Sequence, residues 1–368
     1  MPTPTVLPSK TPNDAWNSTA ERVVRGILCL IVAVLALVPA TGANARTTRA
    51  SIGAGITGPS SLHASVYARG LAHVAALAED ADGNVWAATA TGSTDAADGV
   101  YVIEAGGTPR LVIDDVDAPL GLVWLDNALY VARHAGIEEY SGYDGTSFAE
   151  HHAVLTLPDD VGLVSGLVVG ADGRLVTGVS APCDACTPTS PWSAAIVSVG
   201  TDGSDPHVIV RDVRAAVGFA VLPETGELLA TMNQRDGLGA RTPGDWLAIV
   251  AAGQSWGFPD CYGQGGTACA GVPAPVATLD KHAAVSGVAV VDGQLGSQVG
   301  TGAAVAEWMT GAVKLVRLRT TAHGYSATTT QFLSGFEHPS PVLVTSTGAL
   351  LVGDWGRGRI VKVAASAG

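Results

Sequence analysis

The feature that most constrains the fold of this chain is a hairpin pattern that recurs six times. In each copy an apolar run leads into a turn built on Asp-Gly or a related pair, and then into a second apolar run. Asp, Asn and Gly tolerate the positive φ of a tight turn, so each copy predicts a β-hairpin. The six hairpins begin at Val74, Gly121, Gly166, Gly218, Gly287 and Pro341.

Repetition of hairpins indicates how their apolar faces are buried. A single hairpin leaves one such face in water, whereas a closed ring of hairpins buries the faces and protects the strand edges. Further strand-like runs at 100–103, 194–198 and 313–317 would complete four-stranded blades. No long stretch beyond the N-terminal region has the period of 3.6 residues that is typical of a helix. The sequence therefore predicts an all-β fold, a six-bladed β-propeller over 72–368.

The composition agrees with a single large β unit. Hydrophobic residues make up 47% of the chain, charged residues 14%, and 46 of the 368 residues are glycine. This is enough apolar material for a core, and scattered glycines suit many tight turns. Two long insertions, 178–193 and 232–275, are predicted to be loops on one face, where propellers usually build their binding sites.

The N-terminal 45 residues have the order of an export signal. A polar segment ends in Arg22 and Arg25, an apolar run covers Ile27–Val38, and the small residues Ala43-Asn44-Ala45 follow. This order predicts a signal peptide over 1–45, cleaved before Arg46. The apolar run is shorter than the roughly 20 residues of a membrane-spanning helix, although an uncleaved anchor is the alternative. We therefore expect a secreted or otherwise extracytoplasmic protein, in the periplasm or at the cell exterior.

The segment 46–71 is rich in serine and glycine. We expect it to be a linker that leads into a first strand.

Four cysteines follow the predicted cleavage site: Cys183, Cys186, Cys261 and Cys269. An even number of cysteines in an exported chain predicts disulfides. Four cysteines allow three connectivities, and proximity in the sequence favours Cys183–Cys186 and Cys261–Cys269. The other interpretation of Cys183-Asp-Ala-Cys186, a redox or metal motif, lacks a second close pair and the histidine that haem attachment requires.

The charge of the chain limits its partners. The formal net charge is −13 at pH 7, and an acidic protein is a poor ligand for nucleic acid or an anionic lipid surface. A small neutral molecule such as a sugar fits this charge better, and no membrane span is expected in the mature protein.

The stretch 214–263 carries several motifs in a fixed order. It reads Arg214-Ala-Ala-Val-Gly, then Asn233-Gln-Arg-Asp-Gly-Leu-Gly, then Pro243-Gly-Asp-Trp-Leu and Gly253-Gln-Ser-Trp-Gly-Phe-Pro. This series resembles the glucose/sorbosone dehydrogenase family of soluble quinoproteins. A weaker likeness extends over the rest of 74–365.

The resemblance implies a β-propeller oxidoreductase that acts on CH–OH groups of a sugar. Members of the family use pyrroloquinoline quinone (PQQ) together with calcium, and PQQ is a tricarboxylate that cations must hold. Arg214 matches the arginine that grips the quinone. Lys314, Arg357 and Arg359 are further candidates for binding its carboxylates. Because no cytochrome motif is fused to the chain, the electrons would pass to a separate acceptor.

The resemblance also implies a calcium site in the loop that follows Asn233. The backbone carbonyls of Gln234 and Arg235 match the loop that ligates calcium in the family. Asp236 and Asp245 could bind the ion directly or through water, since calcium prefers oxygen ligands. As turn-forming carboxylates in a glycine-rich loop, both residues would equally have a purely structural role.

The catalytic base is the position where the sequence departs most from the family. Gly162 stands where the family has its catalytic histidine, and Ala215, Val217 and Trp246 replace polar residues. His282 is the candidate base, because it precedes a strand and would lie at the axial face; the alternative is an ordinary loop histidine. The departures favour a second hypothesis, a non-catalytic β-propeller binding protein derived from that family. A calcium-dependent lactonase is a third, but its set of converging Glu, Asn and Asp residues cannot be assembled.

Overall fold

The structure, a computed structural model, describes residues 48–91, 98–104, 106–263, 267–322 and 324–366. All of these belong to one compact unit that begins at Arg46. The predicted signal peptide, 1–45, lies outside the described residues, so it stays a prediction. Within the described ranges, no helix is long and apolar enough to cross a membrane.

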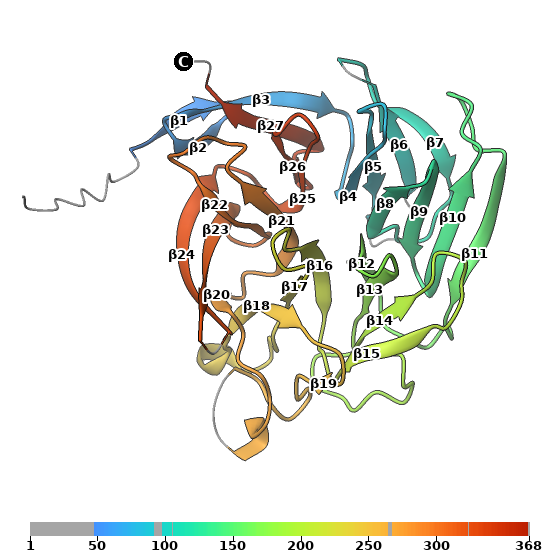
Figure 1. The fold of residues 1–368 in the computed structure, drawn as a ribbon, viewed down its shortest axis with the longest axis vertical. Helices are drawn as coiled ribbons and strands as arrows, with labels where there is room; N and C mark the ends of the chain where they lie inside the picture. Colours follow the sequence, from blue (N-terminus) through green and yellow to red (C-terminus); the bar gives the residue numbers. More distant parts are fainter. Residues whose placement is uncertain (1–47, 92–97, 105, 264–266, 323, 367–368) are drawn as a thin grey trace, which may run out of the picture. The chain divides into compact units, whose positions relative to one another are not determined.

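Six sheets form the blades of a propeller (Figure 1). The first three blades, each given from its innermost strand outward, are β4 (Val74–Glu79), β5 (Val85–Thr89), β6 (Gly99–Ile103) and β7 (Arg110–Asp114); β8 (Gly121–Leu125), β9 (Ala128–Arg133), β10 (Gly136–Ser141) and β11 (Glu150–Thr156); and β12 (Val164–Val169), β13 (Leu175–Val179), β14 (Ala195–Val199) and β15 (His207–Arg211), with the short β19 (Gln254–Ser255) parallel to β15.

The other three blades complete the ring. They are β16 (Ala216–Val221), β17 (Leu228–Met232), β18 (Gly244–Val250) and β20 (Ala277–Lys281); β21 (Val285–Asp292), β22 (Thr301–Glu307), β23 (Ala312–Thr321) and β24 (Gly324–Ser334), extended by β2 (Ile56–Pro59) and β1 (Arg49–Gly53); and β25 (Pro339–Val344), β26 (Leu350–Asp354), β27 (Arg359–Ala365) and β3 (Leu62–Arg69). Two short 3-10 helices, η1 (Gly239–Arg241) and η2 (Thr267–Cys269), lie in loops. The predicted all-β, six-bladed propeller is confirmed, and each predicted hairpin forms the first two strands of a blade.

The last blade joins the two ends of the propeller chain. β3 pairs with β27 in antiparallel register, from Leu62 opposite Ala365 to Arg69 opposite Arg359 (Figure 1). Along β3, Leu62 and Ala64 are buried while the residues between them are exposed, so the strand covers the last blade with one apolar face. The segment expected to be a linker into a first strand thus contains three strands, β1 to β3. Small residues hid the alternation from the sequence pattern.

The two predicted insertions differ in their structure. The segment 178–193 forms the loop between β13 and β14. The segment 232–275, in contrast, includes β18, which is the third strand of the fourth blade. A strand of a blade therefore lies within what the sequence pattern presents as one long loop.

Both predicted disulfides are present. Cys183 is bonded to Cys186 in the β13–β14 loop, and Cys261 to Cys269 in the loop that precedes β20. The proximity argument on the cysteines is confirmed. Two disulfides fit an oxidising, extracytoplasmic compartment.

Glycines let the innermost strands of neighbouring blades approach closely around the axis. A Cβ atom on Gly218 would lie 2.3 Å from the carbonyl oxygen of Ser286 on the next blade. A Cβ atom on Gly121 would lie 2.7 Å from the carbonyl carbon of Gly166 in the same way. Because backbone atoms cannot give way as a flexible side chain can, these positions require glycine, and they fix the width of the axial channel.

The turn between β4 and β5 supplies a prediction on stability. Asp80 accepts hydrogen bonds from the backbone of Asp82 (3.0 Å) and Asn84 (2.9 Å) and from the indole Nε1 of Trp86 (3.0 Å). The Trp86 side chain is fully buried. We expect Asp80→Ala to lower the free energy of unfolding by about 2 kcal/mol, because the indole N–H loses its acceptor in a buried position. Urea denaturation measures this difference.

Asp172 supplies the matched control for that substitution. It occupies the equivalent turn of the third blade but accepts a single backbone N–H, at 3.2 Å. Asp172→Ala should therefore cost less than half as much, and equal losses in the two variants would contradict the assignment.

Candidate functional site

A cavity of about 860 Å³ runs along the axis and is lined by the six innermost strands. This volume lies within the range of roughly 300–1,000 Å³ that is usual for ligand pockets. Its wall is mainly alanine, valine, leucine and glycine, and no arginine, lysine or histidine lines it in the part of the chain that the structure describes. We call the end at which the innermost strands begin the axial mouth; it is marked by Leu163, Ser180, Asn233, Ala284 and Trp308.

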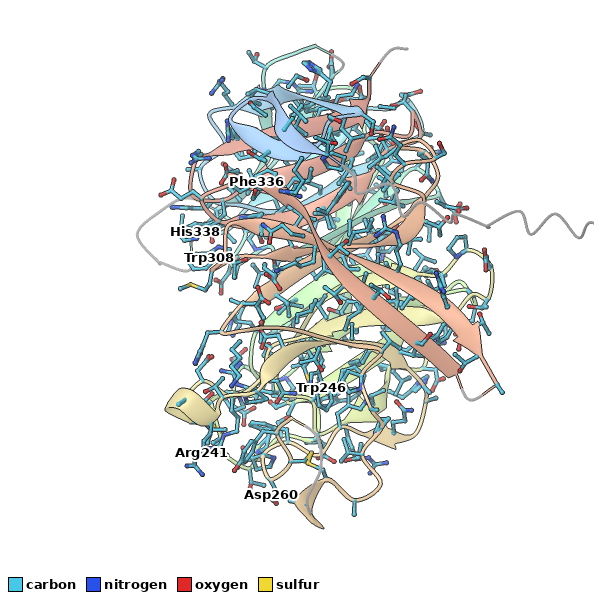
Figure 2. All side chains as sticks on the ribbon, turned by 90° about the vertical axis from the view of Figure 1, so that its left-hand side faces the viewer. Arg241, Trp246, Asp260, Trp308, Phe336 and His338 are labelled. Carbon is cyan, nitrogen blue, oxygen red and sulfur yellow. A yellow bond between two sulfur atoms is a disulfide. The ribbon has the colours of Figure 1, made fainter. Side chains whose placement is uncertain are left out.

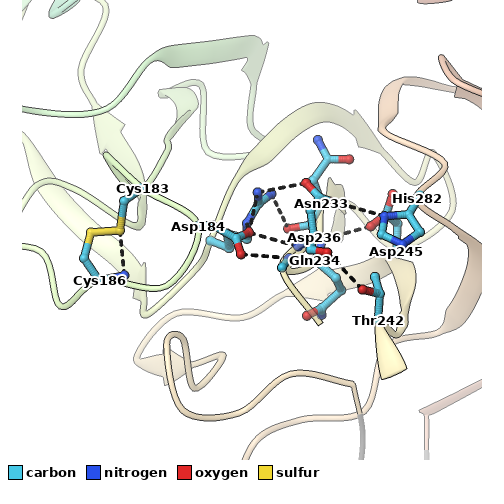
Figure 3. Close-up of polar contacts among 11 residues, drawn as sticks. Cys183, Asp184, Cys186, Asn233, Gln234, Asp236, Thr242, Asp245 and His282 are labelled. Carbon is cyan, nitrogen blue, oxygen red and sulfur yellow. Dashed lines mark hydrogen bonds and ion pairs between the residues drawn. A yellow bond between two sulfur atoms is a disulfide. The ribbon is translucent and has the colours of Figure 1, made fainter. Parts of the chain in front are cut away.

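Arg214 lies beside the axial mouth, in the loop between β15 and β16. Its Nε donates to Oδ1 of Asp184 at 3.1 Å, and its Nη2 lies 2.9 Å from the same oxygen (Figure 3). The same nitrogen lies 3.1 Å from Oδ2 of Asp236. Nη1 lies 3.5 Å from the carbonyl oxygen of Asn233, which lines the mouth. The side chain is 18% exposed, so the guanidinium is held between two carboxylates with part of its surface still accessible.

His282 joins the same group from the loop between β20 and β21. Its Nδ1 lies 3.1 Å from Oδ1 of Asp236 (Figure 3). The side chain is 48% exposed, and the backbone has a φ of 52°, which residues other than glycine adopt infrequently. Two residues later, Ala284 lines the axial mouth. We refer to Arg214, Asp184, Asp236 and His282 as the Arg214 cluster.

Asp245 lies beneath this cluster at the start of β18 and is buried. Its Oδ1 accepts the backbone N–H of Gln234 at 2.8 Å, and its Oδ2 accepts that of Val285 at 3.3 Å. Burial raises the pKa of Asp245 to about 6, and the nearby Asp236 adds to the rise while the two N–H groups and Arg214 oppose it. This carboxylate ties the loop after β17 to the start of β21.

The loop that was predicted to bind calcium offers oxygen atoms. No described residue donates a hydrogen bond to the carbonyl oxygens of Gln234 or Arg235. Within the described ranges, Oδ1 of Asn233 is buried without a partner, and so is Nε of Arg235. No group of three or more His, Cys, Asp or Glu side chains that could hold a metal occurs among the residues described. A calcium site here would therefore depend on backbone carbonyls, which suit this hard cation.

Lys314 is held elsewhere, between the fourth and fifth blades. Its Nζ lies 2.8 Å from Oδ2 of Asp280 and 3.5 Å from Oε2 of Glu307, and the side chain is only 11% exposed. Burial raises the pKa of the Glu307 carboxyl, against the effect of Thr310 and Lys314. This lysine does not line the axial cavity.

Arg357 and Arg359 both bind Asp354. Their nitrogens lie 3.5 Å and 3.2 Å from Oδ2 of Asp354, which is fully buried. Arg359 also donates to the carbonyl oxygen of Ala54, at 3.0 Å, in the turn between β1 and β2. The two arginines thus connect the last hairpin to the N-terminal strands, and the structure does not bring them to the Arg214 cluster.

Gly162 has no room for a side chain. A Cβ atom built on it would lie 2.0 Å from the carbonyl oxygen of Ser180. The position that matches the family's catalytic histidine is therefore filled by backbone of the β13–β14 loop.

An aromatic group beside the mouth was not predicted from the sequence. The rings of Trp308 and His338 stack with centroids 3.7 Å apart at an interplanar angle of 10°, and Trp355 packs edge-on against Trp308 at 5.5 Å. Figure 2 shows Trp308 and His338 next to each other at the left-hand edge of the side view. We call these three residues the aromatic platform. They come from loops of two blades, so no local pattern in the sequence could have grouped them.

Comparisons with known proteins place the fold. No protein-family model and no curated protein matches the chain. Among solved structures, the holo form of the PQQ domain of a pyranose dehydrogenase from Coprinopsis cinerea superposes with a TM-score of 0.68 and 14% identity, over 86% of this chain and 98% of that one. An apo-form soluble aldose sugar dehydrogenase from Escherichia coli gives a TM-score of 0.67 and 16% identity, over 83% and 100%.

A third similar structure is the PQQ-bound aldose sugar dehydrogenase from Streptomyces coelicolor, with a TM-score of 0.64 and 17% identity, over 83% of this chain and 99% of that one. The predicted glucose/sorbosone dehydrogenase-like fold is confirmed. Identities this low establish the fold alone.

Proposed function

We propose that this protein is an exported oxidoreductase that acts on a CH–OH group of a small neutral substrate of the sugar type, with PQQ and Ca²⁺ as cofactors. The observation that carries the proposal is the Arg214 cluster. Arg214, Asp236 and His282 are far apart in the sequence, yet ion pairs join them beside the mouth of the axial cavity. In this proposal the signal peptide is removed and the mature protein is the propeller from Arg46 onward.

The residues of the cluster fit part of the cofactor. The guanidinium of Arg214 suits a carboxylate of PQQ, and the carbonyl oxygens of Gln234 and Arg235, with the carboxylate of Asp236, suit Ca²⁺. When bound, the quinone supplies the oxidising power and calcium polarises it. The other three predicted cations do not fit, because buried carboxylates hold them away from the cavity.

His282 has the geometry of a general base. Its Nδ1 faces a carboxylate, which can only accept a hydrogen bond, so Nδ1 carries the proton and Nε2 is free to accept one from the substrate hydroxyl. Asp236 fixes this tautomer. The aromatic platform offers an apolar face on the same side of the propeller, and the cavity wall excludes water from it. Electrons leave to a separate acceptor.

A second candidate function is that of a non-catalytic propeller that binds a neutral ligand. Two observations favour it: the carbonyl of Ser180 fills the space beside Gly162, and no described cation lines the axial cavity. A cavity with an apolar wall and a few hydroxyl groups suits an uncharged molecule.

Titration of the purified mature protein with PQQ in excess Ca²⁺, followed by quenching of tryptophan fluorescence, tests the proposal. We expect saturable binding in the micromolar range or tighter, and at least about tenfold weaker binding for Arg214→Ala, because the variant lacks a charge-assisted contact to a carboxylate. Arg110→Ala, which removes a guanidinium bound to Tyr143 away from the cavity, should bind as the wild type does. No saturable binding at high micromolar PQQ would leave the non-catalytic candidate.

A further inference from the structure

We propose that Asp184 is the positioning residue of the Arg214 cluster and that the Cys183–Cys186 disulfide holds it in place, so that a dithiol reductant loosens the cluster. The proposed regulation of turnover rests on the proposed function. The structural effect of reduction does not.

Asp184 is the acceptor that connects the cation to the loop. Its Oδ1 accepts Nε of Arg214 at 3.1 Å and the backbone N–H of Asp236 at 2.9 Å, while its Oδ2 accepts the N–H of Gly237 at 3.0 Å (Figure 3). A Cβ atom on Gly237 would lie 2.8 Å from Oδ2 of Asp184, so glycine at this position lets the carboxylate approach. One side chain therefore fixes both Arg214 and the loop that carries the candidate calcium ligands.

The charge of Asp184 is also adapted to this role. Burial disfavours its ionised form, but the N–H groups of Asp236 and Gly237, together with Arg214, outweigh this effect and lower the pKa of the carboxyl. The acceptor is therefore charged at neutral pH, when its hydrogen bonds are strongest.

The disulfide is the local constraint on Asp184. The β13–β14 loop contains no strand between Val179 and Ala195, so no sheet holds Asp184 in position. The bond between Cys183 and Cys186 closes a turn of four residues, with Cα atoms 5.8 Å apart, and Asp184 lies within it. Cys183 is exposed, so a thiol can reach the bond, whereas Cys261 of the other disulfide is 5% exposed.

Reduction is balanced by the reductant. A dithiol gives two electrons and two protons, becomes a disulfide itself, and leaves Cys183 and Cys186 as thiols. The turn then regains conformational freedom. Asp184 no longer stays against Arg214, and the amides of Asp236 and Gly237 lose their acceptor.

Hydrogen–deuterium exchange of the mature protein, with dithiothreitol as the reductant, tests this inference. We expect reduction to speed exchange of the Asp236 and Gly237 amides by about tenfold or more, since each loses a charge-assisted bond. Asp184→Asn should speed it without reductant. The amides of Asp82 and Asn84, which the Asp80 carboxylate binds in the same way, should not change, because no disulfide holds that turn.

Mass spectrometry after alkylation identifies which cysteines are reduced. The double variant Cys183→Ser/Cys186→Ser should reproduce the fast exchange with Cys261–Cys269 intact, which excludes the second disulfide as the cause. Unchanged exchange at Asp236 and Gly237 while Cys183 and Cys186 are alkylated would overturn the inference. Fast exchange in a protein that does not bind PQQ would instead refute the proposed function and leave this inference standing.

Discussion

His282→Ala is expected to lower PQQ- and Ca²⁺-dependent turnover of an aldose by about 10² to 10⁴-fold, the usual contribution of a general base. The imidazole is the titratable side chain that Asp236 orients beside the axial mouth, at 3.1 Å. The position that matches the family's base, Gly162, has no space for a side chain. Dye reduction by the purified protein across a set of aldoses measures the loss, and PQQ binding by fluorescence should change less than threefold.

His134 offers a matched control for this substitution. Its Nδ1 lies 3.2 Å from Oδ2 of Asp117, nearly the same geometry as the His282–Asp236 pair, but it does not line the axial cavity. His134→Ala should retain wild-type turnover. If His282→Ala also retains it, His282 is not the base, and equal losses in both variants would indicate a general effect on folding.

The architecture could be predicted because it is built from local pairs. The turns at Asp82-Gly83 and Asp172-Gly173 each join strands that are neighbours in the sequence, and sequence patterns report such neighbours directly. The closing pair, β3 with β27, joins residues about three hundred positions apart. No turn signals that pair, and the small residues of β3 resemble a linker. The ring could therefore be predicted, but the strand that closes it could not.

The cations show where reasoning by resemblance stopped. Lys314 was predicted to meet a cofactor, but it pairs with Glu307 across the β22–β23 hairpin, and Arg357 and Arg359 pair with the buried Asp354. Asp354 precedes Arg357 by three residues, so the sequence did contain a signal for this ion pair. A match to a motif identifies a residue type, whereas the nearest opposite charge decides whether that residue is available to a ligand.

Asp184 was missed for the opposite reason. Its neighbours in the sequence are the two cysteines, which point to a disulfide, whereas its partners Arg214, Asp236 and Gly237 come from two other loops. Loops that meet at one end of a propeller are brought together by ring closure. Their contacts appear only once the blades are placed.

In the calcium-free protein, Asp245→Asn is expected to remove a fall in stability with rising pH. Burial raises the pKa of Asp245 to about 6, from an ordinary value of 3.8 in the unfolded chain. Between these values the folded protein binds more protons than the unfolded chain, so this contribution to stability is complete below pH 3.8 and is lost as pH rises through 6. A difference of about two units corresponds to about 3 kcal/mol.

Urea denaturation in the presence of a chelator, at about pH 3.5 and pH 7, measures this effect as the difference in unfolding free energy between the wild type and Asp245→Asn. The wild type should lose about 3 kcal/mol relative to the variant over that interval. Added Ca²⁺ should shrink the loss, because a cation bound to the loop at Gln234 would favour the charged carboxylate beneath it. A pH profile that Ca²⁺ does not alter would mean that this loop binds no calcium, and the raised pKa would then be only a consequence of burial.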